Sequence, residues 1–328
     1  MTKGLGFGIL CAERGVTRVG FPYSDTNKRY HTLDHEMKKM FGAKVYKVPL
    51  DAGFSCPNID GRVAFGGCTY CSGRGSGDFA PSALLPLLEQ YELSRRVYLE
   101  KKPSAKFIPY LQAHSNTYAP LERLKTVYEA ALALPDAVGL AIATRADCLS
   151  DEAVEYLFEL NKRTYLTVEL GLQTVHGETA RRINRGHDYE AFLCGYEKLK
   201  GLRRVIHLID YLPGETPDMM RESARAVSAL SPFGVKLHLL YVLEGTAMAK
   251  EYRAGGVYIP GREEYVDTVV SQLRLLSPEI VIARLTGDAP RESLLAPLWS
   301  RNKRATLNAI DQAMARGGYF QGDLVGKG

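Results

Sequence analysis

The chain has 328 residues, of which 45% are hydrophobic and 24% are charged. This is the composition of an ordinary globular protein, and it excludes an intrinsically disordered chain. The formal net charge of +5 is compatible with a polyanionic partner, but it is far below that of a basic RNA-binding tail. No apolar run approaches the roughly 20 residues that a membrane span requires, so we expect no membrane partner.

The N-terminal stretch MTKGLGFGILCAERG contains a short apolar piece but lacks the apolar region of a secretory signal peptide. We therefore expect no cleaved leader. Six cysteines in a leaderless chain favour a reducing compartment, where thiols bind metals or pack in cores rather than form disulfides. The sequence thus predicts a cytoplasmic protein.

Apolar, β-branched runs alternate along the chain with amphipathic runs, which predicts strands and helices in turn. The predicted strands are Lys44–Leu50, Lys106–Gln112, Val138–Thr144, Tyr165–Gln173, Arg204–Leu212 and Lys236–Val242. The predicted helices are Ser82–Leu99, Leu121–Leu134, Asp151–Lys162, Tyr189–Lys200 and Pro217–Leu230. Ser150 and Thr216 are typical N-cap residues for two of these helices.

Strand–helix units with nearly continuous apolar strands indicate a parallel sheet covered by helices. Six units are too few to close an eight-stranded barrel, so we predict an α/β protein with an open, partial (β/α)6 barrel. Residues 44–245 would form this core, between an N-terminal extension (1–43) and a C-terminal extension (246–328). The C-terminal extension is expected to pack on the barrel and is a candidate for part of the substrate site. Ligands of such sheets bind at the carboxyl ends of the strands.

The stretch CPNIDGRVAFGGCTYC directly follows the first predicted strand and contains Cys56, Cys68 and Cys71. A structural zinc ion needs four ligands, and this segment offers no histidine and no fourth cysteine. An iron–sulfur cubane usually takes one cysteine for each iron, so three cysteines would leave one iron open for another ligand. Gly66 and Gly67 would let the backbone turn tightly before Cys68. A structural zinc loop and three buried, reduced thiols remain alternatives.

The cysteine stretch resembles the cluster loop of radical S-adenosylmethionine (SAM) enzymes, in the widely spaced form of Elongator-type tRNA-modifying members. The resemblance covers nearly the whole chain and is to radical SAM proteins of the YtqA/YhcC type. It is carried by KVPLDAGFSCPN, GGCTYC, SNTYAP, ATRADCL, ELGLQT, INRGH, HLIDYLPGET, RLTGDAP, WSRNK and YFQG. One departure is Asp210–Tyr211, where the family pattern has a small turn, and it leaves the shape of the fifth strand's end open.

The resemblance implies a radical SAM barrel with a [4Fe–4S] cluster bound by Cys56, Cys68 and Cys71 and with SAM as the second cofactor. Cleavage of SAM would give a 5′-deoxyadenosyl radical that abstracts hydrogen from the substrate. The sequence does not identify a catalytic side chain. Six residues are expected to contact SAM: Tyr70 at the adenine, Glu169 and Gln173 near the ribose and the amino acid part, Arg185 at the carboxylate, and Gln112 and Asn116 at the amino group.

The Elongator-like motifs imply tRNA as the substrate, with conversion of the wobble 5-carboxymethylaminomethyl-uridine towards 5-aminomethyl-uridine. They also imply an electron donor of the flavodoxin or ferredoxin type and a candidate downstream methyltransferase. Two alternatives remain: a radical SAM enzyme acting on a small molecule or peptide, and a non-catalytic metal-binding protein. Trp299 and Tyr319 flank the last of three basic clusters, and aromatic side chains can stack on the splayed bases of an RNA loop. These clusters give RNA binding a physical basis: Arg181, Arg182 and Arg185; Lys198, Lys200, Arg203 and Arg204; Arg301, Lys303 and Arg304.

Overall fold

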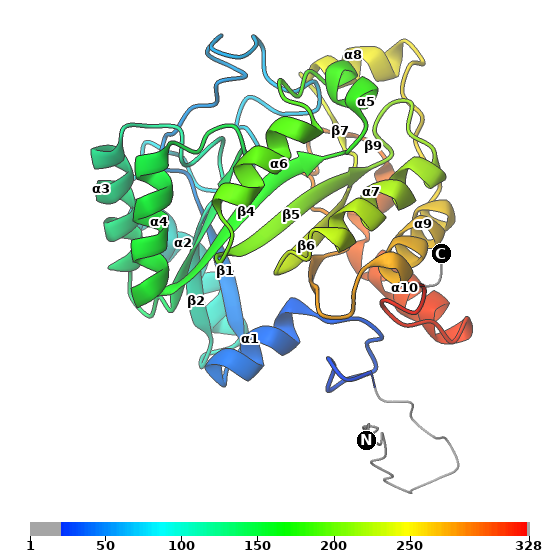
Figure 1. Cartoon of the computed structure of the whole chain (residues 1–328), viewed down its shortest axis with the longest axis horizontal. Coiled ribbons are helices and arrows are strands. Elements are labelled where there is room, and N and C mark those ends of the chain that lie inside the picture. The colour runs from blue at the N-terminus through cyan, green and yellow to red at the C-terminus, as the bar shows by residue number, and fades with distance from the viewer. Residues whose placement is uncertain (1–20, 327–328) are drawn as a thin grey trace, which may run out of the picture.

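One curled parallel sheet forms the centre of the computed structural model, which describes residues 21–326 (Figure 1). The stretch expected to lack a signal peptide falls in residues 1–20, outside the described residues. The strands follow the order β1-β2-β3-β4-β5-β6-β8 and all pair in parallel. The predicted partial α/β barrel is confirmed. Its strands are β1 (Val45–Leu50), β2 (Lys106–Leu111), β3 (Gly139–Thr144), β4 (Tyr165–Gln173), β5 (Arg203–Asp210), β6 (Gly234–Leu239) and β8 (Val281–Arg284).

Helices on one face of the sheet connect successive strands, as the alternating pattern predicts (Figure 1). Both predicted N-caps form, because Ser150 accepts from the Ala153 amide and Thr216 accepts from the Met219 amide. Among residues 21–326, no helix combines the length and the apolarity that crossing a bilayer demands. The connecting helices are α2 (Leu87–Lys101), α3 (Leu121–Leu132), α4 (Asp151–Arg163), α5 (Gly177–Arg182), α6 (Tyr189–Lys198) and α7 (Pro217–Ala229).

The C-terminal part supplies a seventh strand that the sequence analysis missed. Strand β8 has only four residues, too few for a periodic signal, yet it extends the sheet beside β6. The sixth strand ends earlier than predicted, and a separate two-stranded sheet follows it. The division at residues 43 and 245 stays a prediction. The other elements are β7 (Val242–Leu243), α8 (Ala247–Arg253), α9 (Arg262–Leu275), β9 (Leu294–Ala296), the 3-10 helix η1 (Leu298–Arg301) and α10 (Lys303–Arg316).

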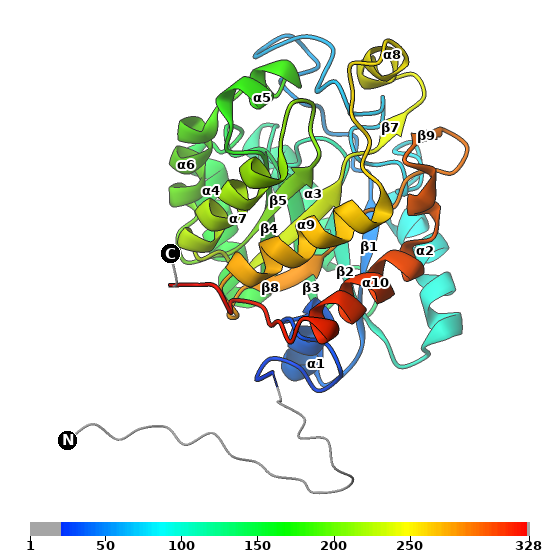
Figure 2. The same ribbon diagram turned by 90° about the vertical axis from the view of Figure 1, so that its right-hand side faces the viewer.

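Helix α1 (Leu33–Phe41) covers the amino-terminal end of the half-barrel, where it contacts both edge strands, β1 and β8 (Figure 2). Thr32 caps the helix and also bridges to Ile282 of β8. Met37 packs beneath the strands against buried residues that include Ile108 and Tyr110. Since this end is closed by apolar packing, the carboxyl ends of the strands are left for a ligand.

The end of β5 explains how the chain accommodates its departure at Asp210–Tyr211. Tyr211 has a φ of 64°, in the left-handed region that glycine and asparagine adopt most readily. Its buried hydroxyl lies 2.7 Å from Thr268 Oγ1 and 3.1 Å from the carbonyl oxygen of Glu264, both in α9. The carboxylate of Asp210 accepts a 2.7 Å hydrogen bond from Gln272 Nε2, also in α9. These contacts with α9 offset the cost of the tyrosine conformation.

Candidate functional site

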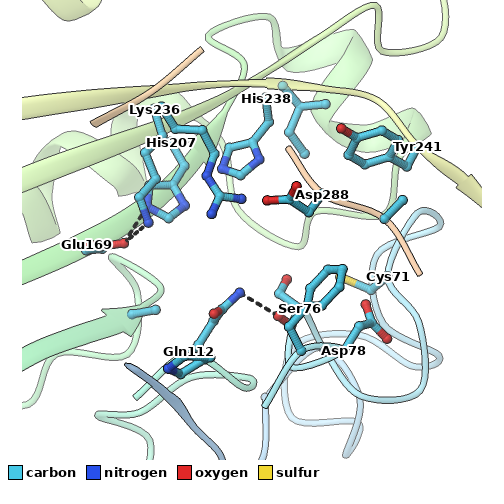
Figure 3. Close-up of a pocket in the computed structure, with 18 of the residues that line it drawn as sticks. Cys71, Ser76, Asp78, Gln112, Glu169, His207, Lys236, His238, Tyr241 and Asp288 are labelled. Atoms are coloured by element: carbon cyan, nitrogen blue, oxygen red, sulfur yellow. Dashed lines mark hydrogen bonds and ion pairs between the residues drawn. The ribbon is translucent and has the colours of Figure 1, made fainter. Parts of the chain in front are cut away.

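A cavity of about 840 Å³ lies inside the half-barrel and reaches the loops at the carboxyl ends of the strands. All three cysteines of the cluster loop, residues 56–71, line it. So do five of the six residues predicted to contact SAM, the exception being Asn116. Figure 3 shows Cys71, Ser76, Asp78 and Gln112 on one side of this cavity, with strand residues facing them from the other. The segment 288–303 supplies another part of the wall.

The cluster loop is folded by its own backbone. The amides of Ile59 and Asp60 both donate to the carbonyl of Cys56, at 2.8 and 3.2 Å, and the Cys71 amide donates to the Cys68 carbonyl at 3.0 Å. Gly66 and Gly67 have φ values of 79° and 76°, which confirms that the turn before Cys68 uses the conformational freedom of glycine. The loop therefore holds its shape largely through backbone contacts rather than through its thiols.

A second segment, residues 183–186 of the INRGH motif, clamps the cluster loop from outside. The Thr69 amide donates to the Ile183 carbonyl at 3.0 Å, and Asn184 Nδ2 donates to the Gly67 carbonyl at 2.7 Å. Asn58 Nδ2 returns a 2.6 Å bond to the Asn184 carbonyl. Gly186 has a φ of 79°, and a Cβ there would lie 2.3 Å from Asn58 Oδ1. The clamp therefore needs glycine at this position.

Cys68 is the most buried of the three cysteines, and two nitrogen donors approach its sulfur. Asn58 Nδ2 lies 3.5 Å and Arg185 Nη1 lies 3.9 Å from Sγ. A hydrogen bond with Cys71 and the Arg185 charge hold the pKa of Cys68 well below its usual range, although burial acts in the opposite direction. A stabilised thiolate is the form that binds iron, so this donor set fits an iron–sulfur cluster.

Among residues 21–326, no three His, Cys, Asp or Glu side chains form a group that could hold a metal ion. Each cysteine of a cubane binds its own iron atom, so its ligands need not share one centre.

Arg185 is buried beside the cluster loop rather than exposed at a helix end. Its Nη2 donates to the Gly171 carbonyl on β4, and its Nε has no partner among residues 21–326. Its own carbonyl accepts from Arg145, whose guanidinium pairs with Asp147 through two contacts of 2.8 and 2.7 Å. Arg145 also lines the cavity and was missed as a site residue, although the ATRADCL motif contains it. The assignment of Arg185 to the SAM carboxylate stays a prediction.

The other predicted SAM contacts divide into two groups. Tyr70, Gln112 and Gln173 line the cavity, with Gln112 Nε2 donating to the Ser76 carbonyl at 2.8 Å (Figure 3). Asn116 is buried outside it, and its Nδ2 donates to the carbonyls of Leu111, Ala113 and Ala143 at 2.9–3.1 Å. These contacts tie together the ends of β2 and β3. The amide oxygen Oδ1, the atom that could accept from an amino group, has no partner among residues 21–326, and the assignment of Asn116 to the amino group of SAM stays a prediction.

Glu169 lies deep in the half-barrel, in the middle of β4. It is not at the end of β4 but four residues before Gln173, or about 13 Å at the usual rise per residue. Its carboxylate forms ion pairs with Lys47 and Lys236 and accepts from Tyr110 Oη at 2.7 Å. His207 Nε2 lies 2.9 Å from the same carboxylate (Figure 3). We call these five residues the barrel floor; Glu169 is its anchor, and its assignment to the SAM ribose stays a prediction.

The electrostatics of the barrel floor are dominated by the two lysines. Burial alone would raise the pKa of Glu169, but the ammonium groups of Lys236 and Lys47 hold it well below its usual range. Burial, with Lys47 and Arg284 nearby, lowers the pKa of Lys236 to about 7. Burial likewise lowers the pKa of His207 to about 4, so this histidine is neutral near pH 7. The floor thus holds an ionised carboxylate among cations.

Two of the three predicted basic clusters reach the cavity, the first through the buried Arg185 alone and the last through two residues. Arg301 and Lys303 line it together with Arg291. The cluster at Lys198–Arg204 precedes and begins β5, at the opposite end of the strands. In the first cluster, Arg182 pairs with Glu251, Arg181 pairs with Glu178, and Arg185 is buried. A basic surface shared by all three clusters is therefore not present.

The two aromatic residues beside the last cluster are engaged by the protein. Trp299 Nε1 donates to the Pro260 carbonyl at 3.0 Å, and its ring packs against Tyr265. Tyr319 lies under the Arg274 guanidinium, 3.8 Å from the ring centroid. Both side chains pack against the core. The expectation that they stack on bases is not supported by this arrangement.

Family models match most of the chain. The Radical SAM superfamily model matches residues 60–227, and the Radical_SAM C-terminal domain model matches residues 232–316. The chain is 49% identical to the uncharacterized protein YtqA of Bacillus subtilis, over 92% of this chain and 94% of that protein. It is 34% identical to the protein YhcC of Escherichia coli K12, over 89% and 94%.

Two more distant similarities point to Elongator-type proteins. A tRNA uridine(34) acetyltransferase of Methanocaldococcus infernus is 29% identical over 47% of this chain and 29% of that protein. The solved structure of an N-terminally truncated Elp3 from the same organism has a TM-score of 0.61 at 18% identity, covering 84% of this chain and 64% of that one. This structural similarity shows the shared fold.

The chain belongs to the radical SAM superfamily. It is a relative of the YtqA and YhcC proteins, and the predicted relation to Elongator-type enzymes is confirmed. Members of this superfamily are enzymes that use a [4Fe–4S] cluster and SAM, so the two predicted cofactors are confirmed at the level of the family. The assignment of Cys56, Cys68 and Cys71 as cluster ligands stays a prediction, supported by the cluster loop described above.

Proposed function

We propose that this radical SAM enzyme modifies the wobble uridine of tRNA, converting 5-carboxymethylaminomethyl-uridine towards 5-aminomethyl-uridine. Cys56, Cys68 and Cys71 would hold the cluster, and Arg185 would hold the SAM carboxylate. The cluster and SAM together supply a carbon radical, which is suited to hydrogen abstraction from a carbon beside nitrogen. The protein's part is to bind a single base inside the cavity and to keep water away from it.

The observation that carries the proposal is a cavity of about 840 Å³ with basic side chains at its edge. An anticodon base can be unstacked into such a cavity at little cost, because the loop already exposes it. Arg301 Nη2 donates to the Arg291 carbonyl at 3.0 Å, and Lys303 pairs with Asp288 at 2.6 Å. These contacts position the cations beside the entrance. The tRNA uridine(34) acetyltransferase relative adds support from sequence.

The decisive experiment is nucleoside analysis of tRNA from cells with and without the gene. The proposal expects the carboxymethylaminomethyl form to accumulate when the gene is deleted, with a matching loss of the products downstream of it. Purified, reconstituted enzyme should then convert tRNA from the deletion strain in the presence of SAM and reductant. An unchanged wobble profile would remove the tRNA assignment and favour a small-molecule or peptide substrate.

The salt dependence of tRNA affinity tests whether the basic residues at the edge of the cavity form the entrance for the RNA. Each neutralised phosphate should contribute about −0.7 to the slope of log affinity against log salt for a single strand. The double variant Arg301→Gln/Lys303→Gln should therefore flatten the slope for tRNA by about 1.4. A matched control is Lys198→Gln/Lys200→Gln, which removes the same charge from the cluster at the far end of the strands. Equal flattening by both variants would show nonspecific attraction instead of an entrance.

Two partners belong to the proposal as well. The cluster needs electrons from outside, so we retain a donor of the flavodoxin or ferredoxin type. A methyltransferase acting on the aminomethyl product remains a candidate downstream partner. Both are testable by adding purified candidates to the reconstituted reaction and measuring product formation.

A further inference from the structure

A row of side chains crosses the sheet below the cluster loop. His207 pairs with Lys236 in the sheet register, and Lys236 pairs with Arg284 of β8. Paired residues of neighbouring parallel strands project to the same face of a sheet, and all three residues line the cavity. His238, two residues after Lys236, projects to this face too. Figure 3 shows His207, Lys236 and His238 across the cavity from Gln112 and Ser76.

In this row and the barrel floor together, positively charged side chains outnumber carboxylates. Lys47 and Arg284 contribute two cations, Lys236 is partly protonated near pH 7, and Glu169 is already paired with both lysines. Arg284 is half-buried, and it has no hydrogen-bond or ion-pair partner among residues 21–326. The other carboxylate on this side, Asp288, pairs with Lys303 at 2.6 Å. Cations removed from water are costly unless an anion compensates them.

We infer that Arg284, with Lys236 beside it, forms the subsite for a carboxylate of the substrate. The inference rests on the proposed function, because the substrate proposed there carries one carboxylate, at the end of its carboxymethylaminomethyl group. A guanidinium suits this role because it can form two parallel hydrogen bonds to a carboxylate. The subsite lies opposite the cluster loop, so a group anchored there extends across the cavity towards the three cysteines.

The first test measures binding rather than turnover. The reconstituted enzyme with SAM is titrated with two anticodon stem-loops, one carrying the carboxymethylaminomethyl group and one carrying its neutral carboxamide. The wild type should prefer the carboxylate RNA by about tenfold or more, since a charge-assisted pair is lost with the amide. Arg284→Gln should abolish this preference, and Arg284→Lys should restore part of it. Arg225→Gln, which removes an exposed charge from α7, should leave the preference intact.

A second test does not depend on RNA. N-Methylglycine carries a carboxylate close to a secondary amine, and N-methylglycinamide keeps the amine but replaces the carboxylate with an uncharged amide group. With SAM present, N-methylglycine should raise the unfolding temperature of the wild type but not of Arg284→Gln, and the amide should raise neither. Inorganic phosphate is the third probe. Stabilisation by phosphate alone would show a phosphate subsite and overturn the inference.

The two tests separate this inference from the proposed function. If N-methylglycine stabilises the wild type through Arg284 while tRNA is never modified, the carboxylate subsite stands and the wobble-uridine assignment fails. If tRNA is modified but Arg284→Gln keeps the full preference for the carboxylate RNA, the subsite is wrong and the function stands. Absence of any carboxylate preference in the wild type also overturns the subsite.

Discussion

The cluster loop and the barrel floor face each other across one cavity, and they are built in opposite ways. The loop is shaped by backbone hydrogen bonds, by left-handed glycines and by the clamp at residues 183–186. The floor is shaped by side chains that rigid strands bring together, with Glu169 paired to Lys47 and Lys236. Loss of a thiol should therefore remove chemistry and leave the fold, whereas loss of the Glu169 charge should weaken the fold itself.

The largest effect is expected at the cluster loop. Changing Cys56, Cys68 or Cys71 to alanine should abolish SAM cleavage, since each thiol is needed to hold one iron. The measurements are iron content after anaerobic reconstitution and formation of 5′-deoxyadenosine. Cys194→Ala is the control, because this cysteine is exposed on α6, away from the cavity. A Cys56→Ala variant that retains both the cluster and the cleavage activity would refute the ligand assignment.

Removing the Glu169 charge from the barrel floor should lower the free energy of unfolding. Glu169→Gln keeps the shape of the side chain but removes the counter-charge of the buried Lys236 and the partly buried Lys47. Breaking a buried pair in this way costs about 3–5 kcal/mol in the free energy of unfolding. Urea unfolding of the protein without cluster and SAM measures this change in the free energy of unfolding. Glu129→Gln breaks an exposed pair with Arg163 and should cost under about 1 kcal/mol. Similar small losses in both variants would mean that Glu169 is not the anchor of the floor.

The sequence predicts the parts of the fold that depend on local patterns, and it misses the parts that depend on distant contacts. The fold is predictable because apolar runs of strand length recur between amphipathic runs, and five of the six predicted strands overlap the observed ones almost fully. Strand β8 was missed because four residues carry no usable period. The end of β5 could not be predicted either, since Tyr211 depends on contacts with α9, more than fifty residues away in sequence.

For the site, the cluster loop was visible because its residues are contiguous and its spacing is unusual. The barrel floor was not recognised, because Lys47, His207 and Lys236 come from three strands and only the folded sheet brings them to Glu169. A usable signal exists nonetheless. Charged residues such as Lys47 in VYKVPL and Lys236 in GVKLHL interrupt otherwise apolar strands. Such residues mark the inner face of a barrel even when they cannot be assigned a ligand.

Arg185 links the two regions, because it contacts both the Cys68 sulfur and the β4 carbonyl of Gly171. Losing a charge-assisted contact usually costs roughly 1.5–3 kcal/mol, so Arg185→Ala should weaken SAM binding by about tenfold or more. Calorimetry on the reconstituted enzyme gives the affinity, and iron content shows whether the cluster remains. Arg182→Ala, in the same segment but paired with Glu251 at the surface, is the control. Unchanged SAM affinity with an intact cluster would contradict the assignment.

The smallest expected effect is on the pH dependence of stability, and it follows from a comparison of two buried carboxyl groups, Glu169 and Asp210. Glu169 has cations beside it and a pKa held well below its usual range, whereas burial raises the pKa of Asp210 to about 7. Asp210 receives one hydrogen bond, from Gln272, and its Oδ2 has no partner among residues 21–326. A raised folded-state pKa means that Asp210 contributes stability fully below its unfolded pKa near 4 and loses it as the pH rises through about 7.

Asp210→Asn removes this titration, so the variant should gain stability relative to the wild type as the pH rises from 5 to 6. The expected gain is about 1 kcal/mol, close to the limit of about 1.4 kcal/mol per pH unit for one proton. Urea unfolding of both proteins at the two pH values measures it. Asp267→Asn, at an exposed position on α9, controls for the change of carboxyl to amide. A difference between Asp210→Asn and wild type that stays constant with pH would show that Asp210 is already ionised, and that burial without a counter-charge does not set its protonation.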